Sequence, residues 1–147
     1  MINFLKKATV ALGGIDTSPK NHKDNFVETL MNQIPGEKIA EIENGGVWVE
    51  FIELGDYEFM DVHLVGFEKY KTFEGAELVF KSGSIELGKL QSDTKEIESH
   101  HSNISNRYLT TVNIEITNLN LDYLFDRAAE TVGFTCKNKT EIFHIIQ

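Results

Sequence analysis

The chain has 147 residues, of which 41% are hydrophobic and 25% are charged. This balance excludes a disordered tail, a collagen-like repeat and a low-complexity linker, and it predicts one globular domain over residues 1–147. The formal net charge is −9, and residues 37–100 alone carry fifteen acidic side chains against six lysines. Because binding of DNA or RNA needs a basic stripe, this charge distribution argues against nucleic acid as a partner.

The compartment is indicated by the cysteine count and by the N-terminal apolar stretch. Cys136 is the one cysteine of the chain, which favours a reducing environment. The apolar run after Lys7 covers only residues 8–12, too short for the core of a signal peptide, and no uncharged run is long enough to cross a bilayer. We therefore expect a cytoplasmic protein with no membrane partner.

Two helices are predicted near the N-terminus. Residues 2–12 place Ile2, Leu5 and Leu12 on one stripe before Gly13-Gly14, which predicts a peripheral helix within residues 1–14. A second helix over residues 20–34 is predicted by the capping signal Ser18-Pro19 and by apolar residues at helical spacing.

After Gly36 the apolar residues alternate with polar ones, which is typical of antiparallel strands. Asn44-Gly45-Gly46 favours a tight turn and predicts a hairpin between residues 38–43 and 47–54. Further strands are predicted over residues 57–66, 76–81, 85–90, 107–117 and 141–146, with a long polar connection over residues 93–106.

A third helix is predicted over residues 121–132, because Leu121, Leu124, Phe125 and Val132 follow helical spacing before Gly133. The expected fold class is therefore α+β. It comprises a twisted antiparallel sheet of about six or seven strands, with room to curl into a half-barrel, two N-terminal helices and one helix near the C-terminus.

Asp61 and His63 are the candidates for a catalytic pair. They lie two residues apart on one predicted strand and so share a face, where a carboxylate could orient an imidazole that acts as a base. Cys136 follows a predicted helix instead of preceding one, so a small apolar filler is the favoured interpretation over a nucleophile paired with His144.

A metal cluster is the second chemical hypothesis. In an extended segment, Glu96, Glu98 and His100 would project to one side, beside His101, and carboxylate and imidazole are ligands of zinc and manganese. The serine-rich surroundings favour a solvated polar loop instead. No cofactor motif is present, because the glycine pairs lack the spacing of phosphate-binding loops.

The acidic sheet residues are also more simply explained as a solvated face than as glycosidase carboxylates. They are Glu50, Glu53, Glu58, Asp61, Glu68, Glu77 and Glu86. We therefore expect a non-enzymatic, acidic interaction module that engages a basic protein partner or associates with itself. The alternatives are a binder of small apolar ligands, with a cup formed by the curved sheet and its many aromatic residues, and a hydrolase that uses Asp61 and His63 or the Glu96 to His101 cluster.

Overall fold

The structure is a computed structural model that describes residues 29–104 and 106–147. Within these residues, no helix combines the length and the apolar character that crossing a bilayer requires. The helix expected over residues 2–12 and most of the one expected over residues 20–34 lie outside the described residues. Of the latter, residues 29–31 are helical and the chain then turns into the first strand.

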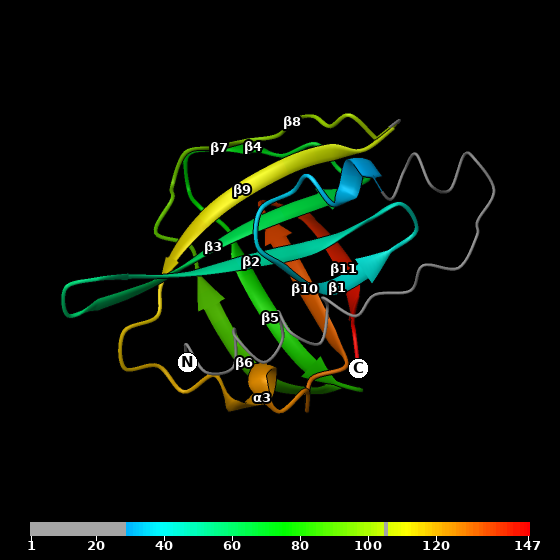
Figure 1. The fold of residues 1–147 in the computed structure, drawn as a ribbon. Helices are drawn as coiled ribbons and strands as arrows, with labels where there is room; N and C mark the ends of the chain where they lie inside the picture. Colours follow the sequence, from blue (N-terminus) through cyan, green and yellow to red (C-terminus); the bar gives the residue numbers. More distant parts are fainter. Residues whose placement is uncertain (1–28, 105) are drawn as a thin grey trace.

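Eleven strands make up most of the described chain (Figure 1). In chain order they are β1 Glu37–Ile42, β2 Gly45–Leu54, β3 Tyr57–Gly66, β4 Lys71–Thr72, β5 Glu77–Ser82, β6 Ile85–Gln91, β7 Ile97–Glu98, β8 His100–His101, β9 Tyr108–Glu115, β10 Thr131–Cys136 and β11 Lys139–Ile145. Nine of them form one antiparallel sheet in the order β6-β5-β10-β11-β1-β2-β3-β9-β8, and β4 pairs with β7 in a second, two-stranded sheet.

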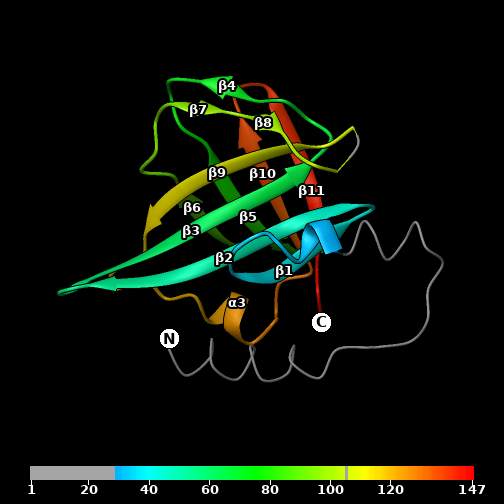
Figure 2. The ribbon, with the colours of Figure 1, turned by 45° about the horizontal axis from the view of Figure 1, so that its top comes forward.

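The large sheet curls until its two edges approach each other (Figure 2). Directly after edge strand β6, the chain passes beside β9, the strand next to β8 at the opposite edge. There the Asp93 backbone N–H donates to the Asn113 carbonyl at 2.8 Å, and the Asn113 N–H donates to Thr94 Oγ1 at 2.9 Å. These bonds link the two sides and leave a nearly closed barrel.

Alternate side chains of the strands point into this barrel and fill it. Val47, Met60, Phe80 and Phe143 are fully buried there, within one contiguous apolar core. Burial of this apolar surface is the main stabilising term for such a sheet. The concave side is consequently occupied by the protein's own side chains.

Short segments cover the two ends of the barrel. At one end lies α3 (Asp122–Phe125), where the Tyr123 ring packs on Phe80 with ring centroids 5.1 Å apart. Gly88 makes this possible, because a Cβ there would come within 2.4 Å of the Tyr123 ring. At the other end lie β4 and β7, and Tyr70 next to β4 meets Phe134 edge-on at 4.9 Å.

The far ends of β2 and β3 extend from the barrel as a hairpin arm, which comprises residues 50–61 (Figures 1 and 2). At the base of the arm β9 still pairs with Phe59, Met60 and Asp61, and Met60 is buried in the core, so the arm is two-stranded only beyond these positions. The pairing of β1 with β2 ends at Glu37 opposite Val49, so the arm continues without β1 beside it. The first half of β2 is buried at every position from Gly45 to Val49, whereas exposure rises from Glu50 to Leu54.

The predicted fold class is wrong: the described chain is mostly β, with nine strands in one sheet instead of six or seven. The largest error is the third helix over residues 121–132. Only Asp122–Phe125 are helical; Arg127 then adopts a positive φ of 57°, and Thr131–Cys136 form β10 between β5 and β11. Gly133, predicted to stop a helix, lies inside this strand. Strand-favouring residues such as Thr131, Val132 and Thr135 gain two neighbouring strands there.

Several local predictions are confirmed. β1 and β2 form a hairpin, with Asn44 at the turn in the left-handed region at φ 54°, and β5 and β6 form another. The strand predicted over residues 107–117 is β9. The polar connection over residues 93–106 contains the short strands β7 and β8, which adds to the strand count.

Candidate functional site

The outer face of β2, β3 and β9 carries the residues that the sequence suggested for chemistry. Register places Trp48, His63 and Thr111 directly opposite one another on the three strands, and Glu50, Asp61 and Asn113 form the next row. Because side chains alternate along a strand, both rows project to the same face, away from the core.

The His63 side chain is hydrogen-bonded to two others, one from each neighbouring strand, and we call these three side chains the polar row. Its Nε2 is 3.0 Å from Glu50 Oε1, and its Nδ1 is 3.1 Å from Thr111 Oγ1. The His63 side chain is 14% exposed and that of Glu50 is 38% exposed. The carboxylate and the hydroxyl together fix the imidazole in one orientation.

Asp61 shares the face of His63, as predicted, but its carboxylate has another partner. Asp61 Oδ1 accepts a hydrogen bond from Asn113 Nδ2 at 2.6 Å. The carboxylate that orients His63 is therefore Glu50, which the sequence analysis included only among the acidic sheet residues. The register of the β2–β3 hairpin was the signal that could have identified it, because Glu50 is a diagonal neighbour of His63.

The arrangement resembles an acid, base and hydroxyl set, but its surroundings do not favour acyl transfer. Hydrolysis through a tetrahedral intermediate needs hydrogen-bond donors aimed at the developing oxyanion. Around His63 the three strands are paired with each other, so their ladder uses the backbone donors of this region. The polar row of Glu50, His63 and Thr111 can hold a proton and orient the imidazole ring. It is well explained as a set of cross-strand hydrogen bonds between polar side chains.

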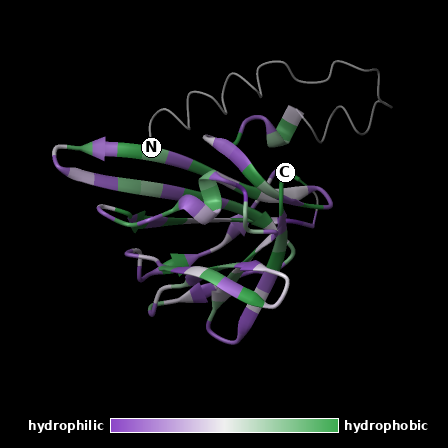
Figure 3. Cartoon of the chain, turned by 90° about the horizontal axis from the view of Figure 1, so that it is seen from below, coloured by the Kyte–Doolittle hydropathy of each residue, from purple (hydrophilic) through white to green (hydrophobic). Residues whose placement is uncertain are grey.

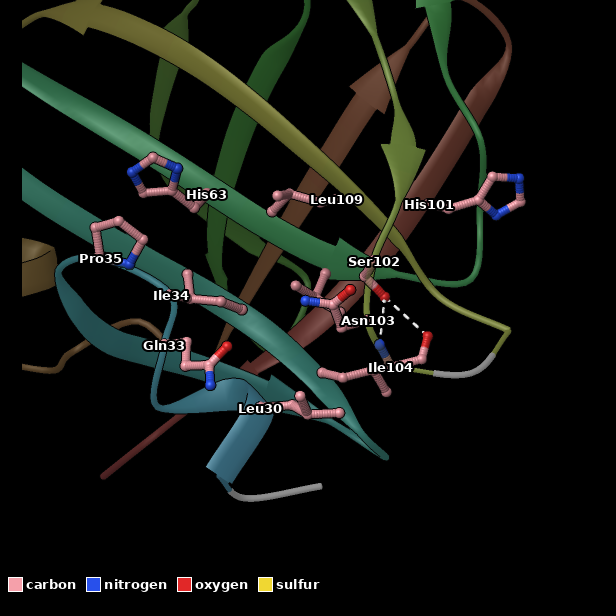
Figure 4. A pocket seen from close by; sticks show the side chains of 11 residues that line it. Leu30, Gln33, Ile34, Pro35, His63, His101, Ser102, Asn103, Ile104 and Leu109 are labelled. Atoms are coloured by element: carbon pink, nitrogen blue, oxygen red, sulfur yellow. Dashed lines mark hydrogen bonds between the residues drawn. The ribbon is translucent and has the colours of Figure 1, made fainter. Parts of the chain in front are cut away.

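A pocket of about 230 Å³ lies beside His63 (Figure 4). One wall is the helical turn and the segment after it, with Leu30 and Ile34, and the opposite wall is the loop before β9, with Ile104. Trp48, Val65 and Ile104 form a small second core beneath it. His63 and His101 lie at opposite sides of the pocket, so they do not converge on one point (Figure 4).

The segment with Glu96, Glu98, His100 and His101 is extended, as its alternation requires, but it forms no cluster. Ile97 and Ser99 point inward and are buried, while His100 and His101 are exposed on β8. The His101 ring packs against Tyr108 at 5.1 Å. Within the described part of the chain, no group of three or more histidine, cysteine or acidic side chains is placed to hold a metal ion.

Cys136 is a buried thiol at the end of β10, and His144 lies far along the next strand. Cys136 is opposite Lys139, whereas His144 is opposite Thr131 at the other end of the β10–β11 pair. Burial raises the pKa of the Cys136 thiol, although Lys137 and Lys139 oppose this shift. The thiol is therefore protonated at neutral pH and acts as a small core residue.

The arm exposes apolar side chains at its tip. Leu54 is 63% exposed and Tyr57, its cross-strand neighbour, is 57% exposed. The Tyr57 ring lies 6.5 Å from the ring of Phe59 on the same face. Figure 3 shows hydrophobic and hydrophilic positions alternating along both strands of the arm.

Comparisons of the chain with protein-family models, with curated proteins and with solved structures return no match. The geometry of the arm, the pocket and the polar row is therefore the basis for the functional interpretation.

Proposed function

We propose that this protein is a non-enzymatic interaction module that binds a basic protein partner through the β2–β3 arm. The single observation that carries the proposal is the composition of residues 50–61 on a segment that projects from the barrel. The arm has no lysine or arginine, and it contains the acidic residues Glu50, Glu53, Asp56, Glu58 and Asp61.

Exposed apolar groups and unbalanced charge serve different steps of binding. Leu54 and Tyr57 offer an apolar anchor that would lose contact with water on docking. The carboxylates nearest them, those of Glu53, Asp56 and Glu58, attract lysine and arginine side chains and accelerate the encounter. A partner with an apolar groove bordered by basic residues fits both features.

The lone, buried Cys136 supports placing this interaction in the reducing cytoplasm. With a single cysteine in its sequence, the chain could not form an internal disulfide in an oxidising compartment. The proposal therefore concerns a cytoplasmic partner.

The test uses the full chain as immobilised bait in a cell extract, compared with two arm variants. Leu54→Ser/Tyr57→Ser removes the apolar anchor, and Glu53→Gln/Asp56→Asn removes two charges. Ile85→Ser and Glu86→Gln, on the exposed β5–β6 hairpin, are the matched controls. We expect basic proteins that are retained by the wild type and by both controls, released by salt, and lost with either arm variant.

A retained set that is unchanged in both arm variants would contradict the proposal. Sedimentation velocity of the purified chain tests the self-associating form of the same idea. If the arm engages a second copy, a dimer forms in the wild type and disappears in Leu54→Ser/Tyr57→Ser.

The pocket beside His63 supports a second candidate, the binding of a small, largely apolar ligand. Its walls are mainly aliphatic, and Gln33 and Asn103 add polar side chains to the lining. It lies on the outer face of the sheet instead of in a cup, since the concave side is filled by the core. A ligand in this pocket should raise the melting temperature of the wild type and fail to do so in Ile34→Asp, independently of salt.

A further inference from the structure

A second cavity, of about 320 Å³, lies at the end of the barrel near β4 and is bordered by lysines. Lys69, Lys71, Lys137 and Lys139 line it, together with Tyr70, Cys136 and Asn138. The residues described include eight lysines, so half of them meet at this one place in an acidic chain. The four come from two Lys-x-Lys motifs whose first lysines, Lys69 and Lys137, are 68 positions apart in the sequence.

The two motifs are held together by a buried carboxylate. Glu141 on β11 accepts hydrogen bonds from the backbone N–H groups of Phe67 and Glu68 at 2.9 and 3.3 Å, and from the Tyr70 hydroxyl at 2.7 Å. Gly66 leaves room for it, because a Cβ there would come within 2.6 Å of Glu141 Oε2. The loop with the first motif is therefore bound firmly to β11, the strand that begins with the last lysine of the second motif.

The nearby carboxylates are already engaged or lie outside the cavity lining. The Glu141 carboxylate accepts the hydrogen bonds described above. Burial and the hydrogen bond to Glu141 raise the pKa of the Tyr70 hydroxyl, which therefore stays protonated and donates that bond. Glu68 pairs with Lys139 at 3.5 Å, and Lys139 Nζ also donates to the Lys69 carbonyl at 2.9 Å. Glu98 lies opposite Lys71 on β7 but is not part of the lining.

This distribution leaves positive charge at the cavity without an ion pair. Among the described residues, Lys69, Lys71 and Lys137 have no carboxylate within 4.0 Å of Nζ. Lys137 also occupies the left-handed region at φ 56° in the two-residue turn between β10 and β11, where glycine or asparagine is usual. Like-charged groups gathered in one place repel one another, and an anion in the cavity would relieve that repulsion.

We infer that this lysine-lined cavity binds a compact, multiply charged anion whose charge is carried by phosphate groups. Lysine is a point charge with three donors, which suits the several oxygens of a phosphate, whereas a single carboxylate would neutralise only one of the three lysines that have no ion pair. The limited size of the cavity and the net charge of −9 of the chain favour a small phosphorylated ligand over a nucleic acid.

The test titrates the full chain with inorganic pyrophosphate at physiological ionic strength and follows backbone amide resonances. We expect saturable shifts at residues 69–71 and 136–139 with a dissociation constant below about 1 mM. Lys71→Gln/Lys137→Gln should weaken binding at least about tenfold, and Lys71→Arg/Lys137→Arg should retain it. Lys81→Gln/Lys89→Gln, on exposed positions of β5 and β6, is the matched control and should change the affinity less than about twofold.

A second measurement needs no ligand. Because the lysines repel one another, Lys137→Gln should raise the melting temperature of the free protein and reduce the stabilisation that pyrophosphate gives. The absence of saturation up to about 10 mM pyrophosphate, or equal binding by the Lys71/Lys137 and Lys81/Lys89 variants, would overturn the inference.

Phosphate groups reach such a cavity either on a soluble molecule or on a lipid headgroup, and vesicles separate these sources. Phosphatidylcholine vesicles that contain phosphatidic acid are compared with vesicles that contain phosphatidylserine at the same mole fraction. Retention that depends on phosphatidic acid and on Lys71 and Lys137 identifies a lipid source for the same site. Binding of pyrophosphate without retention on either vesicle identifies a soluble ligand.

Discussion

The two halves of β2 belong to one strand, yet the first half is buried and the second half is increasingly exposed to solvent. From Gly45 to Val49 the strand lies between β1 and β3, with the core on one face and the second apolar cluster on the other, and every position is buried. From Glu50 to Leu54 it has left β1 behind and reaches into the arm, where Leu54 is exposed. An apolar side chain in the first half stabilises the fold, whereas Leu54, at the end of the second half, is available to a partner.

The charge of the side chains also differs between two regions of the molecule. The arm carries five carboxylates and no basic residue, and the cavity at the β4 end of the barrel is lined by four lysines. Neither grouping is visible from the average composition, because each depends on which loops and strands the sheet topology brings together.

The largest expected effect is the loss of a ring from the barrel core. Phe134 is 1% exposed and meets Tyr70 edge-on. Phe134→Ala should lower the free energy of unfolding by about 3–5 kcal/mol, because the cavity it leaves cannot be filled. Urea unfolding followed by tryptophan fluorescence measures this loss, and a value below about 1 kcal/mol would show that this part of the barrel is not a packed core.

A smaller loss is expected at the carboxylate that anchors the lysine-bearing loop. Glu141→Gln leaves one oxygen to accept the bonds that two now share, so the free energy of unfolding should fall by about 2 kcal/mol. Glu86→Gln on exposed β6 is the control and should be near neutral. Equal effects of the two substitutions in urea unfolding would argue that the Glu141 bonds do not hold the loop.

Glu37 provides a prediction in the opposite direction. Its side chain is buried at the start of β1, its Oε2 has no hydrogen-bond partner among the described residues, and burial raises its pKa although Arg127 opposes the shift. The folded chain therefore binds this proton more tightly than the unfolded chain. Stability falls as pH rises from the ordinary value of 4.5 through the raised pKa, and at neutral pH the charge is a penalty.

Glu37→Gln should therefore raise the free energy of unfolding at pH 7, by about 1 kcal/mol, and the gain should shrink as the pH falls through the raised pKa and be lost below the ordinary value of 4.5. Thermal unfolding of the two proteins across this pH range measures the difference. A loss of stability at pH 7 would show that Glu37 is favourably paired, contrary to its surroundings.

The smallest effect on folding is expected in the arm. Leu54→Ser/Tyr57→Ser removes side chains that are mostly in water already, so the free energy of unfolding should change by less than about 0.5 kcal/mol. Urea unfolding beside Phe134→Ala makes the contrast direct. A loss of several kcal/mol in the arm variant would mean that these residues are part of the fold and not a free surface.

Local chemistry made parts of this fold predictable. Asn44 at a two-residue turn and the alternation of residues 107–117 lead to the observed hairpin and to β9, because both depend on neighbours in the sequence. The prediction of a helix over residues 121–132 was wrong for a physical reason. Leu121, Leu124, Ala129 and Val132 are all buried in the core, so their apolar character was informative, but they reach it from a short helix, a loop and a strand.

The candidate sites were less predictable because they depend on pairing between distant segments. Alternation places Asp61 and His63 on one face, but the choice of Glu50 as the partner of His63 depends on hairpin register, and Thr111 lies 48 residues away. The lysine-lined cavity joins segments that are farther apart still, through the bonds of Glu141. Neither relation is contained in local spacing.

The role of the arm is tested most directly by hydrogen exchange of the protein alone and in complex with a basic protein that the bait retains. The account predicts that backbone amides of residues 50–61 become protected in the complex, while those of the β5–β6 hairpin keep their free rates. Protection confined to other surfaces, with residues 50–61 exchanging as in the free protein, would contradict it.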